Sequence, residues 1–184
     1  MIENVDINRA LEDSSLFRDL KTSELDIIAG LVREGSLERG QHLFHEGDPS
    51  EALYIIRSGA VAIEKALNGS FRLQLARLGP GEIFGEIGLI CRAPRSADAV
   101  ALEALSFWVL ARSDYERLLA NQAALASRLL HGIAVAISQR LIATNQLLMK
   151  LIGQVAPAET TQLLEALSTA DAAGDSASAR GVVP

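Results

Sequence analysis

Turn-forming residues recur through the middle of the chain at intervals too short to contain long helices. Between residues 34 and 112 they are Gly40, Gly47-Asp48-Pro49, Ser58-Gly59, Asn68-Gly69-Ser70 and Gly79-Pro80-Gly81. A spacing of roughly 8 to 12 residues between turns is typical of a β-sandwich or β-barrel. The intervening segments alternate apolar and other residues as half-buried strands do, at Leu53 and Ile55, at Val61 and Ile63, and at Phe71, Leu73 and Leu75. The pattern predicts an antiparallel, jelly-roll-like β-roll, with Asn68-Gly69 as a tight hairpin turn.

Helical patterns flank this region on both sides. Thr22 is placed to cap one helix, and Ser113 is placed to cap another after the last strand. A longer run from about Gln122 to Ile152 carries apolar residues three and four positions apart. A helix of some 30 residues extends about 45 Å, which is more than a domain of this size can cover. This length favours pairing with a second copy of the chain in a homodimer.

The expected fold class is α+β, with four regions along the chain. Residues 1–33 form the N-terminal helices, and residues 34–112 form the β-roll. Residues 113–152 form the C-terminal helices, including the expected dimer helix. Residues 153–184 form a flexible tail, because their small side chains supply too little apolar bulk to fold alone.

Composition restricts the compartment and the partners. Although 49% of the residues are hydrophobic, the richest apolar stretch, Leu125 to Leu151, is interrupted by four basic or histidine residues, so no membrane span is expected. The first nine residues lack the apolar core of a secretion signal. With one cysteine, Cys91, no internal disulfide can form, and a cytoplasmic location is expected. The net charge of -6 argues against a protein whose main partner is nucleic acid.

The most informative chemistry lies between residues 84 and 97. A predicted strand ends near Phe84, Gly85 can expose backbone amides, and Glu86 can open one or two helical turns. A helix N-terminus directs unpaired N–H groups and partial positive charge outward, which suits a phosphate. Arg95 can hold two phosphate oxygens at once, and Ser96 adds a hydroxyl and an N–H. Any one of these residues alone is commonplace, but their order and spacing inside a β-roll are specific.

This segment resembles the phosphate-binding cassette of the cyclic-nucleotide-binding family, which includes the bacterial catabolite activator protein and the regulatory subunits of cyclic-AMP-dependent kinase. The matching residues are Phe84-Gly85-Glu86-Ile87-Gly88-Leu89 followed by Arg95-Ser96-Ala97. The flanking stretches also match, at Phe44-His45-Glu46-Gly47-Asp48, Leu53 to Gly59, and Leu78-Gly79-Pro80-Gly81. The resemblance covers roughly Leu16 to Gln146.

The resemblance implies a ligand, cAMP or cGMP, and a role for each matched position. Arg95, Ser96 and the Ser96–Ala97 backbone would bind the cyclic phosphate, while Glu86 and the Gly85 backbone would bind the ribose. Within the family, a Ser directly after the cassette arginine tends to accompany cAMP as the ligand. The implied function is a stand-alone sensor, not an enzyme, that relays a helix rearrangement to an unknown effector protein. The complete set of candidate ligand-binding residues is Phe84, Gly85, Glu86, Ile87, Arg95, Ser96, Ala97, Thr144 and Asn145, the last two for base contact on the long helix.

The chain departs from the family's transcription factors after the long helix. Those proteins add a winged helix-turn-helix of some 70 residues, whereas Gly153 to Pro184 carries a single basic residue, Arg180. No direct DNA binding is therefore expected. An alternative function stays open, in which the chain keeps the fold but has lost or changed its ligand and acts as an interaction or dimerisation module.

Other classes of site fit the sequence less well. A metal-dependent cupin would need clustered histidines and carboxylates, but His42 and His45 are three apart on a predicted strand. That spacing would send their side chains to opposite faces, and His131 lies on the long helix, so no metal site is expected. A dinucleotide fingerprint is excluded because Gly79, Gly81 and Gly85 miss its spacing. A haem or iron–sulfur sensor lacks ligands because Cys91 stands alone, so no cofactor is expected.

Overall fold

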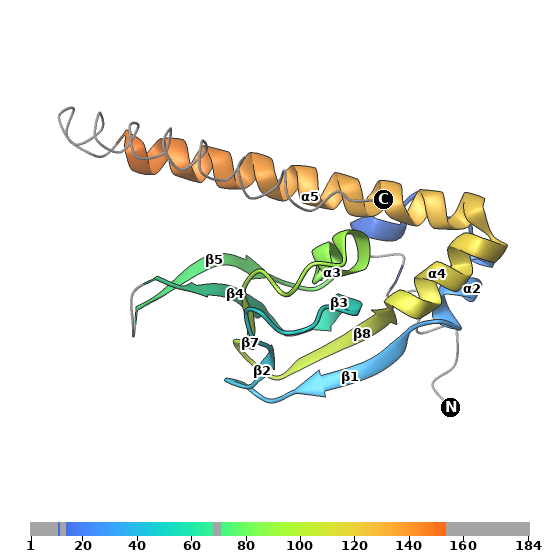
Figure 1. The fold of residues 1–184 in the computed structure, drawn as a ribbon, viewed down its shortest axis with the longest axis horizontal. Helices are drawn as coiled ribbons and strands as arrows, with labels where there is room; N and C mark the ends of the chain where they lie inside the picture. The colour runs from blue at the N-terminus through green and yellow to red at the C-terminus, as the bar shows by residue number, and fades with distance from the viewer. Residues whose placement is uncertain (1–10, 12–13, 68–70, 154–184) are drawn as a thin grey trace, which may run out of the picture. The chain divides into compact units, whose positions relative to one another are not determined.

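The structure is a computed structural model that describes residues 11, 14–67 and 71–153. Its β-strands form two four-stranded antiparallel sheets, and helices lie before, between and after them (Figure 1). The expected α+β fold, an antiparallel β-roll with N-terminal helices and a long C-terminal helix, is confirmed. The predicted tail from residue 154 onward and the Asn68-Gly69-Ser70 turn lie outside the described residues.

The first sheet has the strand order β1-β8-β3-β6. Its strands are β1 (Arg33–Leu37), β8 (Leu105–Ala111), β3 (Ala52–Ser58) and β6 (Ile83–Phe84). The alternation predicted for β3 is confirmed, because Leu53 and Ile55 are fully buried. Ile56 on the opposite face is buried as well. The sheet is therefore covered on both faces, by helices on one side and by the second sheet on the other.

The second sheet has the strand order β2-β7-β4-β5. Its strands are β2 (His42–Phe44), β7 (Asp98–Ala101), β4 (Val61–Ala66) and β5 (Arg72–Leu78). Val61 and Leu78 are buried against the first sheet. The expectation of a half-buried β5 was wrong over most of its length, because Phe71, Leu73 and Leu75 are all exposed. Only the end of this edge strand reaches the core.

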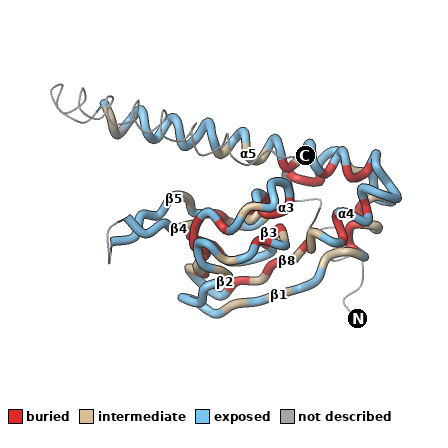
Figure 2. Tube along the Cα trace, in the orientation of Figure 1, coloured by how far each residue is buried: buried red, intermediate tan, exposed pale blue. Residues whose placement is uncertain are grey.

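Helical residues up to Ile137 pack against the outer face of the first sheet. The helices are the 3₁₀ turn η1 (Ser15–Phe17), α2 (Thr22–Ala29), α4 (Arg112–Asn121) and α5 (Ala123–Ile152), while α3 (Glu86–Cys91) follows β6. The first turns of α5 bury Leu125, Leu129 and Ile133 in the same cluster as Leu25 and Ile28 of α2. Figure 2 marks buried positions in these first turns of α5. Gly132 lets α5 lie against η1, since a Cβ there would lie 2.3 Å from the carbonyl oxygen of Leu16.

Two predicted helix caps are displaced by neighbouring contacts. Thr22 is the first residue of α2, and the Lys21 amide before it donates to the Glu24 carboxylate at 2.9 Å. Ser113 lies inside α4, because β8 runs to Ala111 and the Arg112 amide donates to the Glu51 carbonyl at 2.8 Å. Helix α2 therefore begins at its predicted cap, and α4 begins one residue before its predicted cap.

The chain divides into two compact units, Met1–Ile137 and Ser138–Pro184, so the division falls within α5. In the second unit, residues 138–152 are the remainder of that helix. Among the described residues, no helix is both long enough and apolar enough to cross a membrane.

Candidate functional site

Gly85 stands at the junction between β6 and α3 and adopts a conformation that side chains resist. Its φ angle is 74°, in the left-handed region. A Cβ at this position would lie 2.4 Å from an Nη atom of Arg95 and 3.0 Å from the Ala52 carbonyl oxygen. The missing side chain therefore lets the arginine lie directly against the backbone. The structure brings these two predicted residues together although they are ten positions apart.

Arg95 is a buried cation with neutral neighbours for its hydrogen bonds. Its side chain is 6% exposed. One Nη donates to the Gly85 carbonyl at 3.2 Å and the other to the Tyr54 hydroxyl at 3.3 Å. Its Nε has no hydrogen-bond partner in the described part of the chain. Burial lowers the pKa of Arg95 from its ordinary value, against opposing effects of Tyr54, Glu86 and Asp48, but an arginine stays charged in proteins.

Aromatic rings complete the surroundings of Arg95. The guanidinium lies 4.1 Å from the ring centre of Phe44 and 5.2 Å from that of Tyr54. Tyr54 stacks in turn on Phe84, with 5.1 Å between ring centres. The sequence analysis did not assign Phe44 or Tyr54 to the site. Both lie in the flanking stretches that matched the family, and that match was the one available signal.

The loop after β2 holds the backbone of Arg95. The Gly47 amide donates to the Arg95 carbonyl at 2.8 Å, and the Arg95 amide donates to the Asp48 carbonyl at 2.9 Å. The Asp48 carboxylate also accepts from the His45 amide at 2.7 Å, which closes the turn. The arginine is thus fixed by backbone pairing with a loop almost 50 positions earlier in the chain.

The remaining predicted residues occupy different environments. Phe84 and Ala97 are buried, and Phe84 packs in the core between the two sheets. Glu86 is buried at 6% exposed, whereas Ile87 and Ser96 are exposed. Thr144 and Asn145 are exposed on α5 beyond Ile137. Their assignment to the base remains a prediction.

Helix α3 is anchored from two sides. Gly88 lies against Ser50, since a Cβ on Gly88 would fall 1.6 Å from the serine hydroxyl oxygen. The Arg112 guanidinium, at the start of α4, donates to the carbonyl oxygens of both Ser50 and Gly88. The short helix that carries Glu86 is therefore tied to the start of the C-terminal helices.

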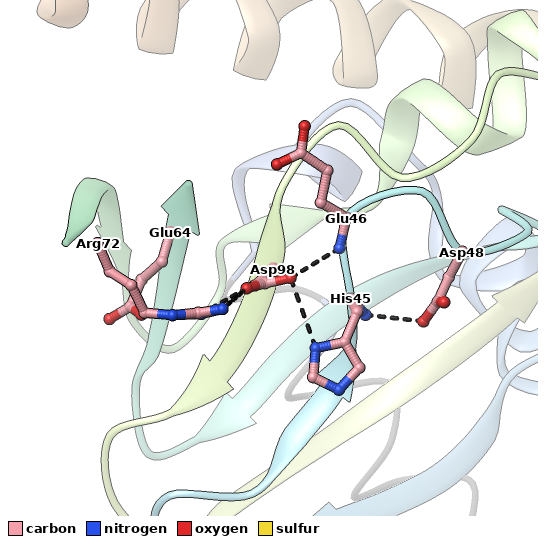
Figure 3. Close-up of polar contacts among 6 residues, drawn as sticks. All are labelled: His45, Glu46, Asp48, Glu64, Arg72 and Asp98. Carbon is pink, nitrogen blue, oxygen red and sulfur yellow. Dashed lines mark hydrogen bonds and ion pairs between the residues drawn. The ribbon is translucent and has the colours of Figure 1, made fainter. Parts of the chain in front are cut away.

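A second polar group surrounds Asp98 at the start of β7 (Figure 3). Its carboxylate accepts from the Glu46 amide at 2.7 Å and pairs with the Arg72 guanidinium. Burial opposes ionisation of Asp98, but the hydrogen bond from Glu46 and the charge of Arg72 outweigh it, so the pKa lies below its usual range. His45 Nδ1 lies 3.5 Å from the same carboxylate.

The predicted separation of His42 and His45 was wrong. Their rings stack with 4.4 Å between centres. The spacing rule fails for two reasons. Strand β2 ends at Phe44, so His45 lies outside it. The pairing of β2 with β7 also shifts register between His42 and Phe44. Both rings consequently lie beside Asp98.

Comparisons with known proteins agree with this architecture. A model of the cyclic nucleotide-binding domain matches residues 34–122. The cyclic AMP receptor protein of Thermus thermophilus is 34% identical over 131 residues, which are 71% of this chain and 59% of that protein. The chain thus spans less than two thirds of this relative's length.

Solved structures show the same fold. A cyclic nucleotide-binding domain from Methylobacillus flagellatus superposes with a TM-score of 0.71 at 28% identity, covering 80% of this chain and 83% of the other. The regulatory domain of a Toxoplasma gondii PKA, crystallised with cAMP, has a TM-score of 0.57 at 31% identity, covering 62% of this chain and 44% of the other. The two-sheet fold, the match over residues 34–122 and these relatives together establish that the chain belongs to the cyclic nucleotide-binding domain family.

Proposed function

We propose that the chain senses a 3′,5′-cyclic nucleotide, with cAMP as the preferred ligand, through the segment from Phe84 to Ala97. The observation that carries this proposal is the state of Arg95. Arg95 is a buried cation whose hydrogen bonds go to neutral oxygens and whose Nε–H lacks a partner in the described part of the chain. Burial of such a group costs free energy, and a bound anion would offset that cost. A phosphate offers charged acceptors, which form stronger hydrogen bonds than the Gly85 carbonyl or the Tyr54 hydroxyl do.

The neighbouring residues supply the remaining contacts of a cyclic nucleotide. Glu86, buried at the start of α3, offers carboxylate oxygens to a ribose hydroxyl. Ser96 is exposed next to Arg95 and offers a hydroxyl and an amide to the phosphate. The preference for cAMP is supported by Ser96 and by two relatives, one a cyclic AMP receptor protein and the other a kinase regulatory domain crystallised with cAMP.

The output of the sensor is a helix rearrangement read by an effector protein. The link from Gly88 through Arg112 gives the ligand segment a direct connection to α4, and α4 leads into α5. The ligand can shift these helices only by its differential affinity for their two arrangements. No catalytic role is proposed. The exposed apolar residues of α5 favour a homodimer, and they would also serve an interaction module that lacks a ligand.

The deciding experiment compares cAMP binding by wild type, Arg95→Ala and Arg77→Ala in calorimetry. Loss of the partner of a desolvated phosphate typically costs about 2 to 5 kcal/mol, or on the order of 30- to 4,000-fold in affinity. The Arg95→Lys variant should lose nearly as much cAMP affinity, because an ammonium cannot make the bidentate contact with the phosphate. Arg77, exposed on β5, is the matched control and should bind as wild type does.

Folding is checked in parallel, because Arg95 also contacts Phe44 and Tyr54. Thermal unfolding identifies any variant that has lost its structure, and Arg95→Lys keeps most of the side-chain volume. Titrations with cGMP and cyclic di-GMP rank the ligands. If folded Arg95→Ala binds cAMP within threefold of wild type, the assigned site is wrong. If wild type binds none of the three nucleotides, the interaction module replaces the sensor.

A further inference from the structure

Three side chains of metal-ligating type converge at the junction of β2 and β7, and none of them is among the residues assigned to the nucleotide. They are His42 on β2, His45 in the loop that follows and Asp98 at the start of β7. One ligand atom from each residue lies within 4.8 Å of the other two. The three residues span 57 positions of sequence, so only the pairing of β2 with β7 brings them together.

The distances suit a small cation after slight side-chain adjustment. Ligands bound tetrahedrally to Zn²⁺ at about 2.0–2.1 Å lie about 3.4 Å from each other. His45 Nδ1 and the Asp98 carboxylate are already 3.5 Å apart. The two imidazole rings already lie close together, with 4.4 Å between centres. An imidazole nitrogen binds a metal in the plane of its ring, so the rings would rotate out of their stacked arrangement to direct both nitrogens at one ion. Both histidines are exposed, so solvent and ions reach them.

The surroundings orient Asp98 as a ligand. Arg72 pairs with one carboxylate oxygen, Oδ2, while Oδ1 faces the Glu46 amide and His45 (Figure 3). Hydrogen bonds of this kind fix the direction of a ligating carboxylate. Among the described residues the group is acidic, because the four carboxylates of Glu46, Asp48, Glu64 and Asp98 outnumber the cations that act on them, which are Lys65, Arg72 and Arg95. A divalent cation would reduce that excess.

We propose that His42, His45 and Asp98 form a binding site for a divalent transition-metal ion of the Zn²⁺ type. Two imidazoles and one carboxylate leave at least one coordination position for water. Nitrogen ligands select such an ion over Mg²⁺ or Ca²⁺, which prefer sets of oxygen ligands. The bound ion would fasten the loop after β2 to the start of β7.

The test uses the full chain without a histidine tag, in a Cys91→Ser background, because the Cys91 thiol is exposed and thiolates are zinc ligands. Zinc chloride is titrated while the imidazole signals are followed by NMR. The chain has three histidines, so His131 on α5 is an internal reference. The signals of His42 and His45 should shift or broaden together at one equivalent of Zn²⁺, and the His131 signal should stay in place.

Variants separate this site from nonspecific binding. His42→Ala and His45→Ala should each weaken Zn²⁺ affinity in calorimetry by at least about tenfold, since loss of a mere supporting partner already costs 10- to 100-fold. His131→Ala should match the parent. Zinc should raise the melting temperature of the parent and not that of His45→Ala, because a ligand of the folded state stabilises it. Equal Zn²⁺ affinity in the parent and both site variants, or no binding by the parent, would overturn the proposal.

Discussion

At the scale of single residues, the site depends on a close fit between a glycine and an arginine. Gly85 places its backbone where any Cβ would meet the Arg95 guanidinium, and its positive φ angle is one that other residues resist. The arginine gains a buried position against Phe44 and Tyr54. Each residue therefore makes the other's placement possible.

Gly85→Ala should weaken cAMP binding by more than tenfold and destabilise the fold. The left-handed conformation alone costs an alanine about 1 to 2 kcal/mol, and the contact with Arg95 adds to that. Gly40→Ala is the matched control, because Gly40 has a φ angle of 83° but nothing lies within 4 Å of its added Cβ. Urea unfolding and calorimetry measure the two effects. Wild-type affinity in folded Gly85→Ala would show that the contact is not needed for binding.

At the scale of secondary structure elements, the notable contact is the one between α3 and α4. Arg112 donates to the Ser50 and Gly88 carbonyls. One guanidinium therefore joins the end of the loop before β3, helix α3 and the first turn of α4. Gly88 permits this by lying directly against Ser50. If α3 shifts when the proposed ligand binds, Arg112 would transmit that shift to α4 without an intermediate element.

Saturation with cAMP should change hydrogen exchange in residues 112–152, because α4 and α5 follow the ligand helix. Arg112→Met should reduce that change while cAMP still binds, since Arg112 donates to the Ser50 and Gly88 carbonyls and is not among the residues assigned to the nucleotide. Arg117→Met is the control within α4, as its pairing with Asp114 on the same helix does not reach α3. Identical exchange over residues 122–152 in free and saturated wild-type protein would rule out the relay.

At the scale of the whole molecule, apolar surface remains exposed in both units. On the first unit it lies over β5 and the residues beside it, at Leu67, Phe71, Leu73 and Leu75. On the second it lies along α5, at Leu141, Ile142, Leu147, Leu148 and Met149. Apolar surfaces this extensive mark interaction sites on most proteins. Such a distribution is what a dimer helix would show in an isolated chain.

We expect the chain to be a homodimer in solution, with about twice the 19.7 kDa mass of one chain in light scattering. Changing both Leu141 and Leu148 to Glu should produce monomers, because these residues are seven apart on one helix face and would place like charges in the interface. Gln146→Glu adds a charge elsewhere on the exposed helix and should leave the dimer intact. A wild-type monomer mass with and without cAMP would contradict the prediction.

Much of the architecture follows from local sequence patterns and could be predicted from the sequence. The turn spacing predicted the β-roll because a chain that reverses direction every 8 to 12 residues can only form short strands. The helical periodicity predicted the long C-terminal helix, which the structure confirms as Ala123–Ile152. The order of Gly85, Glu86 and Arg95 pointed to one site because the segment between β6 and β7 is short and contiguous.

Only the tertiary structure determined the contacts between segments that lie far apart in sequence. Alternation in β5 indicated two faces but not that Leu73 and Leu75 would be left uncovered, since coverage depends on the neighbouring layer. Phe44 and Tyr54 reach Arg95 through the pairing of strands, and His42 and His45 meet because a register shift overrides simple alternation. Strand pairing and layer packing set these positions, and neither is encoded in the period of a single segment.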